Sequence, residues 1–490
     1  MRPLRSLFPI ATLVLVLVAT GCDRDRITDP ADTVPSGTVP SVEETADPRV
    51  ESLAAQLALA AHWEIDPERA PDVDGLDRIV GPVTVVDRAA LTEDVVHVVF
   101  EIRTGNGPYD AIRLHRVVRE RRPGRPIRAP ESLFLLHGSG VGFEGSFLAA
   151  PSDPAERSLP VFLAENGIDV WGIDLGWTLV PPAETDVTVF DEWGLERDVR
   201  DLELGVAIAR VARLLTGSGI ARLNLLGWST GESKGYVYLA READRPRFLR
   251  NVKTFLPVDS GLLSTDPQVQ QGRCDAIAGI EALLDGGIFA DDTGVLARTA
   301  AGLAAQDPDG VSPLGFAPLT NLQTLLLAQS QTGTVFGTDP ASFHLFAGTF
   351  DATGLPDGFR YVPVSTGIEF YASWAPYEPW LTKRDIAQYD CPTVAPVLPA
   401  DFGAIEVPIL YVGAGGGNGA VGEDLQGFVG SDDFRSLIVS TDANPFLDFG
   451  HADLFKAEDA RALFWQPVLD WIEEHAGRGG RGGRGALATR

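Results

Sequence analysis

Short apolar runs alternate with stretches of helical spacing along most of the chain, and this alternation is the feature that most restricts its fold. An uninterrupted apolar run of about four to eight residues is typical of a strand buried on both faces. Strands of this kind that alternate with helices form a mainly parallel sheet. The runs lie at residues 133–136, 169–173, 223–226, 252–256, 409–412 and 436–439. We therefore predict an α/β fold with a mainly parallel sheet flanked by helices.

The remaining elements of this pattern fall between and before the runs. Helices are predicted at 196–215, 232–241 and 457–475, and two strands at 97–103 and 111–118 form a hairpin around Gly105, Asn106 and Gly107. The interval 261–404 breaks the alternation, so we predict that it is an inserted cap subdomain. The core would then consist of residues 48–260 and 405–476.

An aromatic cluster lies late in the predicted cap. Aromatic side chains pack into cores and also line substrate pockets, so both roles stay open for this cluster. Its members are Phe370, Tyr371, Trp374, Tyr377 and Trp380.

The N-terminus is typical of an export signal. Arg2 and Arg5 precede an apolar run that ends in Ala-Thr-Gly-Cys22, so residues 1–21 read as a signal peptide with a lipobox-like cleavage site. Lipid on Cys22 would anchor the protein in the membrane of a bacterial cell envelope, on the periplasmic side or at the cell surface. An ordinary secretory signal is the alternative, because Ala19 stands where lipoboxes usually carry Leu.

Composition adds three expectations about the rest of the chain. Residues 22–47 lack aromatics and read as a flexible tether, and the Gly/Arg-rich residues 477–490 read as a disordered tail. A formal charge of -28 argues against nucleic-acid partners. In an exported protein the remaining pair, Cys274 and Cys391, is expected to form a disulfide, although two separately buried thiols are the alternative.

The sequence Gly227-Trp-Ser-Thr-Gly231 carries the strongest chemical signal. It lies between an apolar strand and an amphipathic helix, which is where a sharp turn presents a nucleophilic serine in this fold class. Ser229 is therefore the predicted nucleophile. The alternative is a tight turn in which Ser229 only caps the helix.

An acyl-transfer site also needs N–H donors for the developing oxyanion. Thr230 follows the nucleophile, and Ser139 lies in the glycine-flanked loop after the apolar run at 133–136. We predict that the backbone amides of Ser139 and Thr230 form the oxyanion hole. His137, in the same loop, is expected to orient the loop rather than act as a base.

The general base must follow the last strand, because the chain order in this fold class is nucleophile, acid, histidine. His451 is the histidine in that position, between the strand at 436–439 and the terminal helix. The others lie too early, inside the predicted cap or at the end of the last helix. His451 is therefore the predicted base.

The sequence offers several candidates for the acid that orients this histidine. Its usual place is the loop after the strand at 409–412, but that loop is glycine-rich and has no carboxylate before Glu423 and Asp424. The preceding strand leads directly into Asp259. Asp259 is our first choice and Asp424 the alternative, with Glu423, Asp432 and Asp433 behind them. A purely structural role for Asp259, as a cap for the next turn, also stays open.

Several segments, taken together and in order, resemble the acid lipase branch of the α/β-hydrolases, the family of gastric and lysosomal lipases. The resemblance covers about residues 95–260 and 405–475 and misses the predicted cap. It implies the α/β-hydrolase fold and lipase or esterase activity. The segments are the hairpin at 105–116, the loop at 136–139, residues 169–172, residues 190–194 with Asp198 and Asp201, the turn around Ser229, residues 252–255 and residues 449–453.

Two departures from that family concern the acid. The family usually has its acid after the penultimate strand, where this chain has glycines and Asn418, and commonly has a small apolar residue where this chain has Asp259. A loss at one position and a gain at the other are what an acid moved between neighbouring strands would produce.

The predicted function is hydrolysis of carboxylic esters with an apolar acyl or aromatic part, through an acyl-enzyme on Ser229. Ser rather than Asp at this position argues against an epoxide hydrolase or a dehalogenase. No cofactor is expected and the sequence shows no metal-ligand constellation. The alternatives are a lipid-anchored binding protein that keeps the fold without catalysis, and an amidase or acyltransferase with the same triad.

Overall fold

The structure is a computed structural model that describes residues 83–315, 318–337 and 340–477. The predicted signal peptide, Cys22, the tether and almost all of the Gly/Arg tail lie outside these residues, as does the start of the first core segment. Within them, no helix is both long and apolar enough to span a bilayer.

A twisted sheet of ten strands organises the described residues, in the order β1-β2-β3-β6-β5-β7-β8-β13-β14 with β4 beside β3. The strands from β6 through β14 pair in parallel, whereas β1, β2 and β3 pair antiparallel with their neighbours and β3 runs antiparallel to β6. The strands are β1 (Thr84–Ala90), β2 (Val95–Arg103), β3 (Ala111–Arg122), β4 (Arg125–Pro126), β5 (Ser132–Leu136), β6 (Asp169–Asp174), β7 (Leu223–Trp228), β8 (Val252–Val258), β13 (Ile409–Ala414) and β14 (Phe434–Val439).

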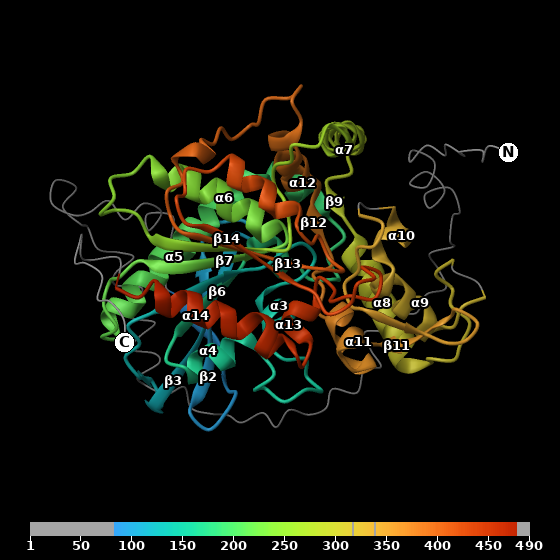
Figure 1. The fold of residues 1–490 in the computed structure, drawn as a ribbon, viewed down its shortest axis with the longest axis horizontal. Coiled ribbons are helices and arrows are strands. Elements are labelled where there is room, and N and C mark those ends of the chain that lie inside the picture. The colour runs from blue at the N-terminus through green and yellow to red at the C-terminus, as the bar shows by residue number, and fades with distance from the viewer. Residues whose placement is uncertain (1–82, 316–317, 338–339, 478–490) are drawn as a thin grey trace.

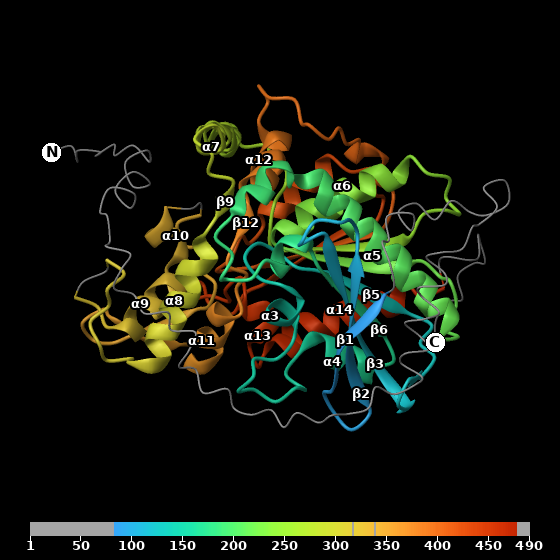
Figure 2. The same cartoon turned by 180° about the vertical axis from the view of Figure 1, so that it is seen from behind.

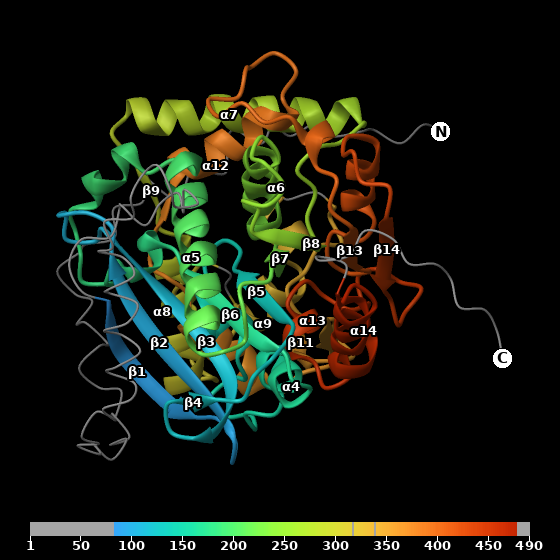
Figure 3. The same ribbon diagram turned by 90° about the vertical axis from the view of Figure 1, so that its left-hand side faces the viewer.

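Helices cover both faces of this sheet (Figure 3). α5 and α6 lie on one face, and α4 and α14 lie on the other. A separate apolar cluster fills the space between the sheet and each helical layer. The helices of these layers and their connections are α3 (Phe143–Phe147), α4 (Leu159–Glu165), η5 (Gly176–Leu179), η6 (Val187–Glu192), α5 (Leu195–Leu215), α6 (Thr230–Ala243), η9 (Val421–Gly427), α13 (Asp453–Lys456), η10 (Arg461–Trp465) and α14 (Gln466–Glu474).

The chain between β8 and β13 forms an insertion whose helices α8 to α11 gather beside one end of the sheet (Figures 1 and 2). Alanines of α8 share an apolar cluster with strand residues of the core, so the insertion packs directly on the sheet region. Its elements are α7 (Pro267–Asp285), β9 (Ala290–Asp291), α8 (Thr293–Gln306), α9 (Asn321–Ser330), α10 (Thr332–Phe336), β10 (Gly348–Phe350), β11 (Pro356–Phe359), α11 (Val364–Ala372), β12 (Glu378–Pro379), α12 (Trp380–Ala387), η7 (Gln388–Asp390) and η8 (Phe402–Ala404).

The predicted disulfide is present. Cys274, in α7, is bonded to Cys391, which directly follows η7. The bond therefore closes a loop of 117 residues within the insertion. Closing a long loop lowers the entropy of the unfolded chain and so stabilises this segment.

The core follows the predicted pattern with three differences. The structure adds β1, whose sequence has no clear apolar run and whose residues differ in burial, and the two-residue β4. The predicted helix at 457–475 is wrong at its start: the chain enters a π-helical turn only at Arg461, and α14 begins at Gln466. Pro467 lacks the N–H that a regular α-helix would use at this point, which favours the wider turn before it.

Candidate active site

Ser229 lies at the sharp turn between β7 and α6. Its backbone has φ 56°, a left-handed conformation that a serine seldom adopts, and its N–H donates to the Val258 carbonyl at 2.9 Å. The flanking glycines make the turn possible. A Cβ on Gly227 would lie 2.4 Å from the Gly231 carbonyl oxygen, and one on Gly231 would lie 2.5 Å from that of Leu136. The turn that presents Ser229 therefore requires glycine at positions 227 and 231, because a side chain at either position would clash with the backbone.

The loop after β5 packs against this turn. A Cβ on Gly138 would lie 3.2 Å from Ser229 Oγ, so the backbone of the loop passes directly beside the hydroxyl. Ser139 Oγ donates to Glu378 Oε1 at 3.0 Å and lies 3.1 Å from Thr230 Oγ1. The structure thus brings together the side chains of Ser139 and Thr230, the two predicted oxyanion-hole residues, and both residues lie beside Ser229.

His137 holds this loop in place through hydrogen bonds to the backbone. Its side chain is fully buried, its Nε2 accepts from Leu175 N–H at 3.3 Å, and its Nδ1 lies 2.8 Å from the Gly138 carbonyl oxygen. Burial, and after it the charge of Lys234, lowers the pKa of His137 to about 4. A neutral imidazole that bonds only to backbone fits the predicted orienting role.

His451 and Asp259 form a direct pair. His451 Nδ1 donates to Asp259 Oδ2 at 2.6 Å, and Asp259 is fully buried. Asp259 also has a left-handed backbone, with φ 50°. It shares this conformation with Ser229 alone among the described residues other than glycine. The two strained positions follow adjacent parallel strands, β7 and β8.

The glycine-rich loop after β13 encloses the carboxylate of Asp259. Oδ1 accepts from the N–H groups of Ala414 at 2.8 Å and Asn418 at 3.0 Å, and the Asn418 side chain donates to the Asp259 carbonyl at 2.7 Å. A Cβ on Gly417 would lie only 2.0 Å from Oδ2. The loop that lacks a carboxylate of its own therefore accommodates the carboxylate from the neighbouring strand.

The alternative acid, Asp424, lies elsewhere. Its carboxylate accepts from Ser264 Oγ and from the Thr265 N–H, both at 3.1 Å, and so ties η9 to the start of the insertion. Asp433 pairs with Arg435 and His475 at the far end of β14. The structure brings Asp259 to His451 and does not bring these carboxylates to it.

One contact of the histidine loop was not evident from the sequence. The N–H groups of His451 and Ala452 donate to the carbonyls of His344 and Leu345, at 2.9 and 2.8 Å. His344 is itself fully buried, and its Nε2 lies 2.9 Å from the Asp448 carbonyl oxygen. A segment of the insertion thus holds the loop that carries His451. His344 and Leu345 belong to no motif or regular spacing in the sequence that would predict this contact.

Ser229 and His451 line one cavity of about 370 Å³. The rest of its wall is mainly apolar and comes from α8, α9 and the aromatic cluster. Of that cluster, Phe370, Tyr371, Trp374 and Tyr377 line the cavity, whereas Trp380 lies beside Lys383. Phe370 and Tyr371 also belong to the buried core, so these side chains both pack in the core and line the cavity.

The cavity has one charged corner. Lys383 pairs with Asp291 and, at 3.1 Å, with Glu378, and all three line the wall. Burial alone would lower the pKa of Lys383, but the two carboxylates raise it well above its usual range, so the group stays charged. Because Glu378 also accepts from Ser139, this corner adjoins the loop after β5.

No family model and no curated protein matches the chain. Among solved structures, a candidate lipase from Sulfolobus solfataricus aligns over 80% of this chain and 99% of its own, with 18% identity and a TM-score of 0.56. An epoxide hydrolase mutant from Vigna radiata aligns over 78% and 100%, with 14% identity and a TM-score of 0.42. At these identities the likeness concerns the fold. The chain has the α/β-hydrolase fold, with a mostly parallel sheet flanked by helices.

Proposed function

We propose that this protein is a serine hydrolase that cleaves carboxylic esters, with Ser229 as nucleophile, His451 as general base and Asp259 as the orienting acid. The observation that carries the proposal is the His451–Asp259 bond at 2.6 Å, because His451 lines one apolar cavity together with Ser229, which lies at a strained turn. The resemblance of the sequence to acid lipases supports an ester as the substrate.

The proposed reaction follows from the hydrogen bonds. With Nδ1–H given to Asp259, Nε2 of His451 is the nitrogen that would accept the Ser229 proton. Ser229 Oγ then attacks the ester carbonyl, and the amides of Ser139 and Thr230 hold the oxyanion. His451 returns the proton to the leaving alcohol, and water releases the acyl group by the same route in reverse.

The walls of the cavity support an apolar acyl group. Ala297 and Ala300 present small side chains to the cavity from α8, which leaves room for a chain between α8 and the aromatic cluster. The charged corner at Lys383 is the one markedly polar part of the wall away from the serine and histidine. We assign the acyl part to the apolar region and the alcohol part to the side of the charged corner.

Hydrolysis of a series of nitrophenyl esters with increasing acyl length tests this proposal. We expect turnover by the wild-type protein, a preference for medium or long acyl chains, and loss of turnover in Ser229→Ala. Ser139→Ala is a useful companion, because it keeps the backbone N–H and should retain most activity. No ester turnover by the wild type, or equal turnover in Ser229→Ala, would refute it; cleavage of the matching amides alone would point to an amidase.

We also propose that the protein is exported and anchored through lipid on Cys22. The charged start, apolar run and Ala-Thr-Gly-Cys sequence support this, and a disulfide between Cys274 and Cys391 fits an oxidising compartment. Labelled palmitate supplied to a bacterial host should enter the wild type and not Cys22→Ser. Labelling of both, or of neither, would contradict the anchor.

A further inference from the structure

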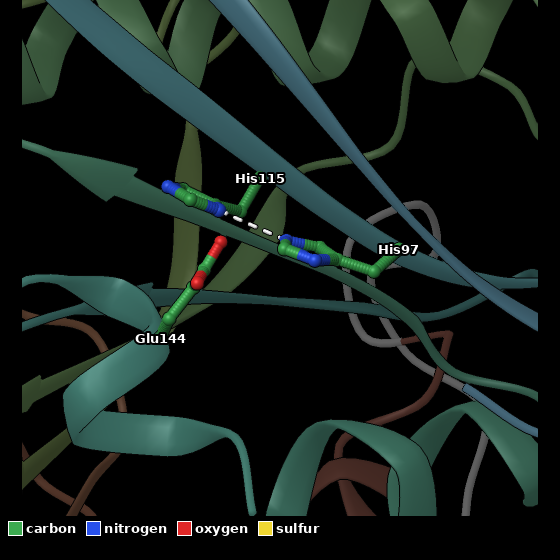
Figure 4. Close-up of side chains that lie close together, drawn as sticks. All are labelled: His97, His115 and Glu144. Carbon is green, nitrogen blue, oxygen red and sulfur yellow. Dashed lines mark hydrogen bonds between the residues drawn. The ribbon is translucent and has the colours of Figure 1, made fainter. Parts of the chain in front are cut away.

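Two buried histidines meet on the face of the sheet that carries α3, outside the cavity of Ser229. His97 comes from β2 and His115 from the adjacent β3, and His97 Nε2 lies 2.9 Å from His115 Nδ1 (Figure 4). Both side chains are almost fully buried, and the ring of Phe143 stacks on that of His115 at 4.4 Å. The rings are therefore held with two nitrogens facing each other.

A carboxylate approaches the same point. Glu144 extends from α3 toward the space beside the two facing nitrogens (Figure 4). One ligand atom from each of Glu144, His97 and His115 lies within 4.8 Å of the others. The three residues come from three elements with no regular spacing in sequence, which is why the sequence showed no metal-ligand constellation.

Asp174 sets the state of one of the rings. Its Oδ2 lies 3.0 Å from His115 Nε2, and its Oδ1 accepts from the Phe143 N–H at 2.6 Å. An ionised carboxylate at Nε2 favours the tautomer with the proton there, which leaves a lone pair on Nδ1 directed at His97. A carboxylate behind the distal nitrogen is also the usual support of a metal-binding histidine.

We infer that His97, His115 and Glu144 bind one divalent transition-metal ion, with Zn²⁺ the best match. Two imidazoles and one carboxylate, with water in a remaining position, are a ligand set that Zn²⁺ takes in proteins. Zn–N bonds of about 2.0–2.1 Å place two nitrogens roughly 3.3 Å apart in tetrahedral geometry. The hydrogen bond between the two nitrogens, at 2.9 Å, must therefore break, and both rings must turn so that their lone pairs point toward a common position beside Glu144. The exposed, flexible Glu144 side chain covers the remaining distance.

The site is open to solvent on one side. A pocket of about 490 Å³ is lined by His115, Glu144 and Asp174 and also by Asp87 and Arg113. It gives a hydrated cation a route in and leaves room for a water ligand. The whole lining holds three carboxylates and two guanidinium groups, those of Arg113 and Arg298, so its net charge favours a cation by one unit.

The bound ion would fix the position of α3 and would take no direct part in ester hydrolysis. α3 begins two residues after Val141, which lies in the loop that also carries Ser139, and Val141 lines the cavity of Ser229. Fixing Glu144 to β2 and β3 would fix the start of α3 and so the end of that loop. We therefore expect the ion to stabilise the fold and to affect hydrolysis only through the loop.

Calorimetric titration of the untagged, full-length protein with Zn²⁺, after chelator treatment and dialysis, tests this inference. The wild type should bind one Zn²⁺ per chain, and Glu144→Gln, which removes a ligand at an exposed position, should weaken binding at least about tenfold. Glu156→Gln, at another exposed position, is the matched control and should bind as the wild type does. A wild type that binds no Zn²⁺, or equal binding by Glu144→Gln, would overturn the inference.

Two further readouts make the result independent of ester hydrolysis. Bound Co²⁺ in place of Zn²⁺ should give the visible spectrum of a four- or five-coordinate ion with nitrogen ligands in the wild type, and a changed or absent spectrum in Glu144→Gln. Zn²⁺ should also raise the Tm of the wild type more than that of Glu144→Gln, because a ligand that binds the native state stabilises it. Equal Tm shifts and identical spectra in the two proteins would also count against the site.

Discussion

The pairs His451–Asp259 and His115–Asp174 each join a buried histidine to an aspartate, and they differ in their surroundings. His451 gives Nδ1 to Asp259 at 2.6 Å, whereas His115 pairs through Nε2 with Asp174 at 3.0 Å. His451 lines an apolar cavity with Ser229, whereas His115 and Asp174 line a polar pocket with Glu144, and His97 contacts His115. One arrangement suits proton transfer, and the other suits a cation.

The comparison teaches that the carboxylate alone does not set the role of a histidine. In both pairs an aspartate fixes the tautomer and the ring orientation. The group near the other ring nitrogen decides the role of the histidine. A serine hydroxyl can give its proton to that nitrogen, whereas a second imidazole and a carboxylate can bind a metal ion together with it.

Removing the charge of Asp259 should have the largest effect. Asp259→Asn offers an amide where His451 needs an acceptor, which favours the wrong tautomer, and we expect kcat for ester hydrolysis to fall about 10³–10⁴-fold. Asp424→Asn is the control and should keep kcat within about threefold. The opposite result for the two variants would move the acid to Asp424.

Adding a methyl group beside Asp259, without changing Asp259 itself, should have the second-largest effect on the rate. The Cβ of Gly417→Ala would lie 2.0 Å from Asp259 Oδ2, so the carboxylate must shift and His451 with it. Displacements of this size cost about 10²-fold in rate. Gly427→Ala, where a Cβ meets no atom within 4 Å, serves as the control for the steady-state kinetics. If both variants retain full kcat, the glycine loop does not position the acid.

On the other side of the comparison, Asp174→Asn should weaken Zn²⁺ binding about 10–100-fold, because the supporting carboxylate of a ligand histidine is lost. Asp87→Asn removes a charge from the wall of the same pocket without a contact to either ring, and should change the Kd by less. Calorimetric titration separates the two. An equal loss in both would show that the charge of the wall matters and the orientation of His115 does not.

The smallest effect should come from the apolar wall of the serine cavity. Ala300→Leu on α8 fills space that the acyl chain would occupy, so kcat/KM for long-chain esters should fall about tenfold while short-chain esters change little. Ala305→Leu, on the exposed side of the same helix, is the control. Equal losses for short and long esters in Ala300→Leu would place the acyl group elsewhere.

Much of the fold was predictable from the sequence, because parallel strands buried on both faces leave uninterrupted apolar runs. The serine turn was predictable for a local reason, since its glycines are required by contacts across the turn itself. β1 was missed because it is an edge strand with mixed burial. The π-helical turn that precedes α14 depends on one residue, Pro467, inside a sequence that otherwise has helical spacing.

The rest of the site depends on contacts between distant segments. Asp259 was predicted as the acid from its place after a strand, but its enclosure by the amides of Ala414 and Asn418 follows only from the register of β8 and β13. The backbone contacts of His344 and the meeting of His97 with His115 and Glu144 likewise have no periodic signal, because each joins residues from separate elements.

Labelling with a fluorophosphonate, followed by mass mapping of the modified peptide, tests the central claim most directly. A fluorophosphonate reacts with a serine only where a base activates it and an oxyanion hole receives the charge. The wild type should carry one phosphonyl group on Ser229, Ser229→Ala should carry none, and Asp259→Asn should label far more slowly than Asp424→Asn. An unlabelled wild type, or label on another serine, would contradict the account.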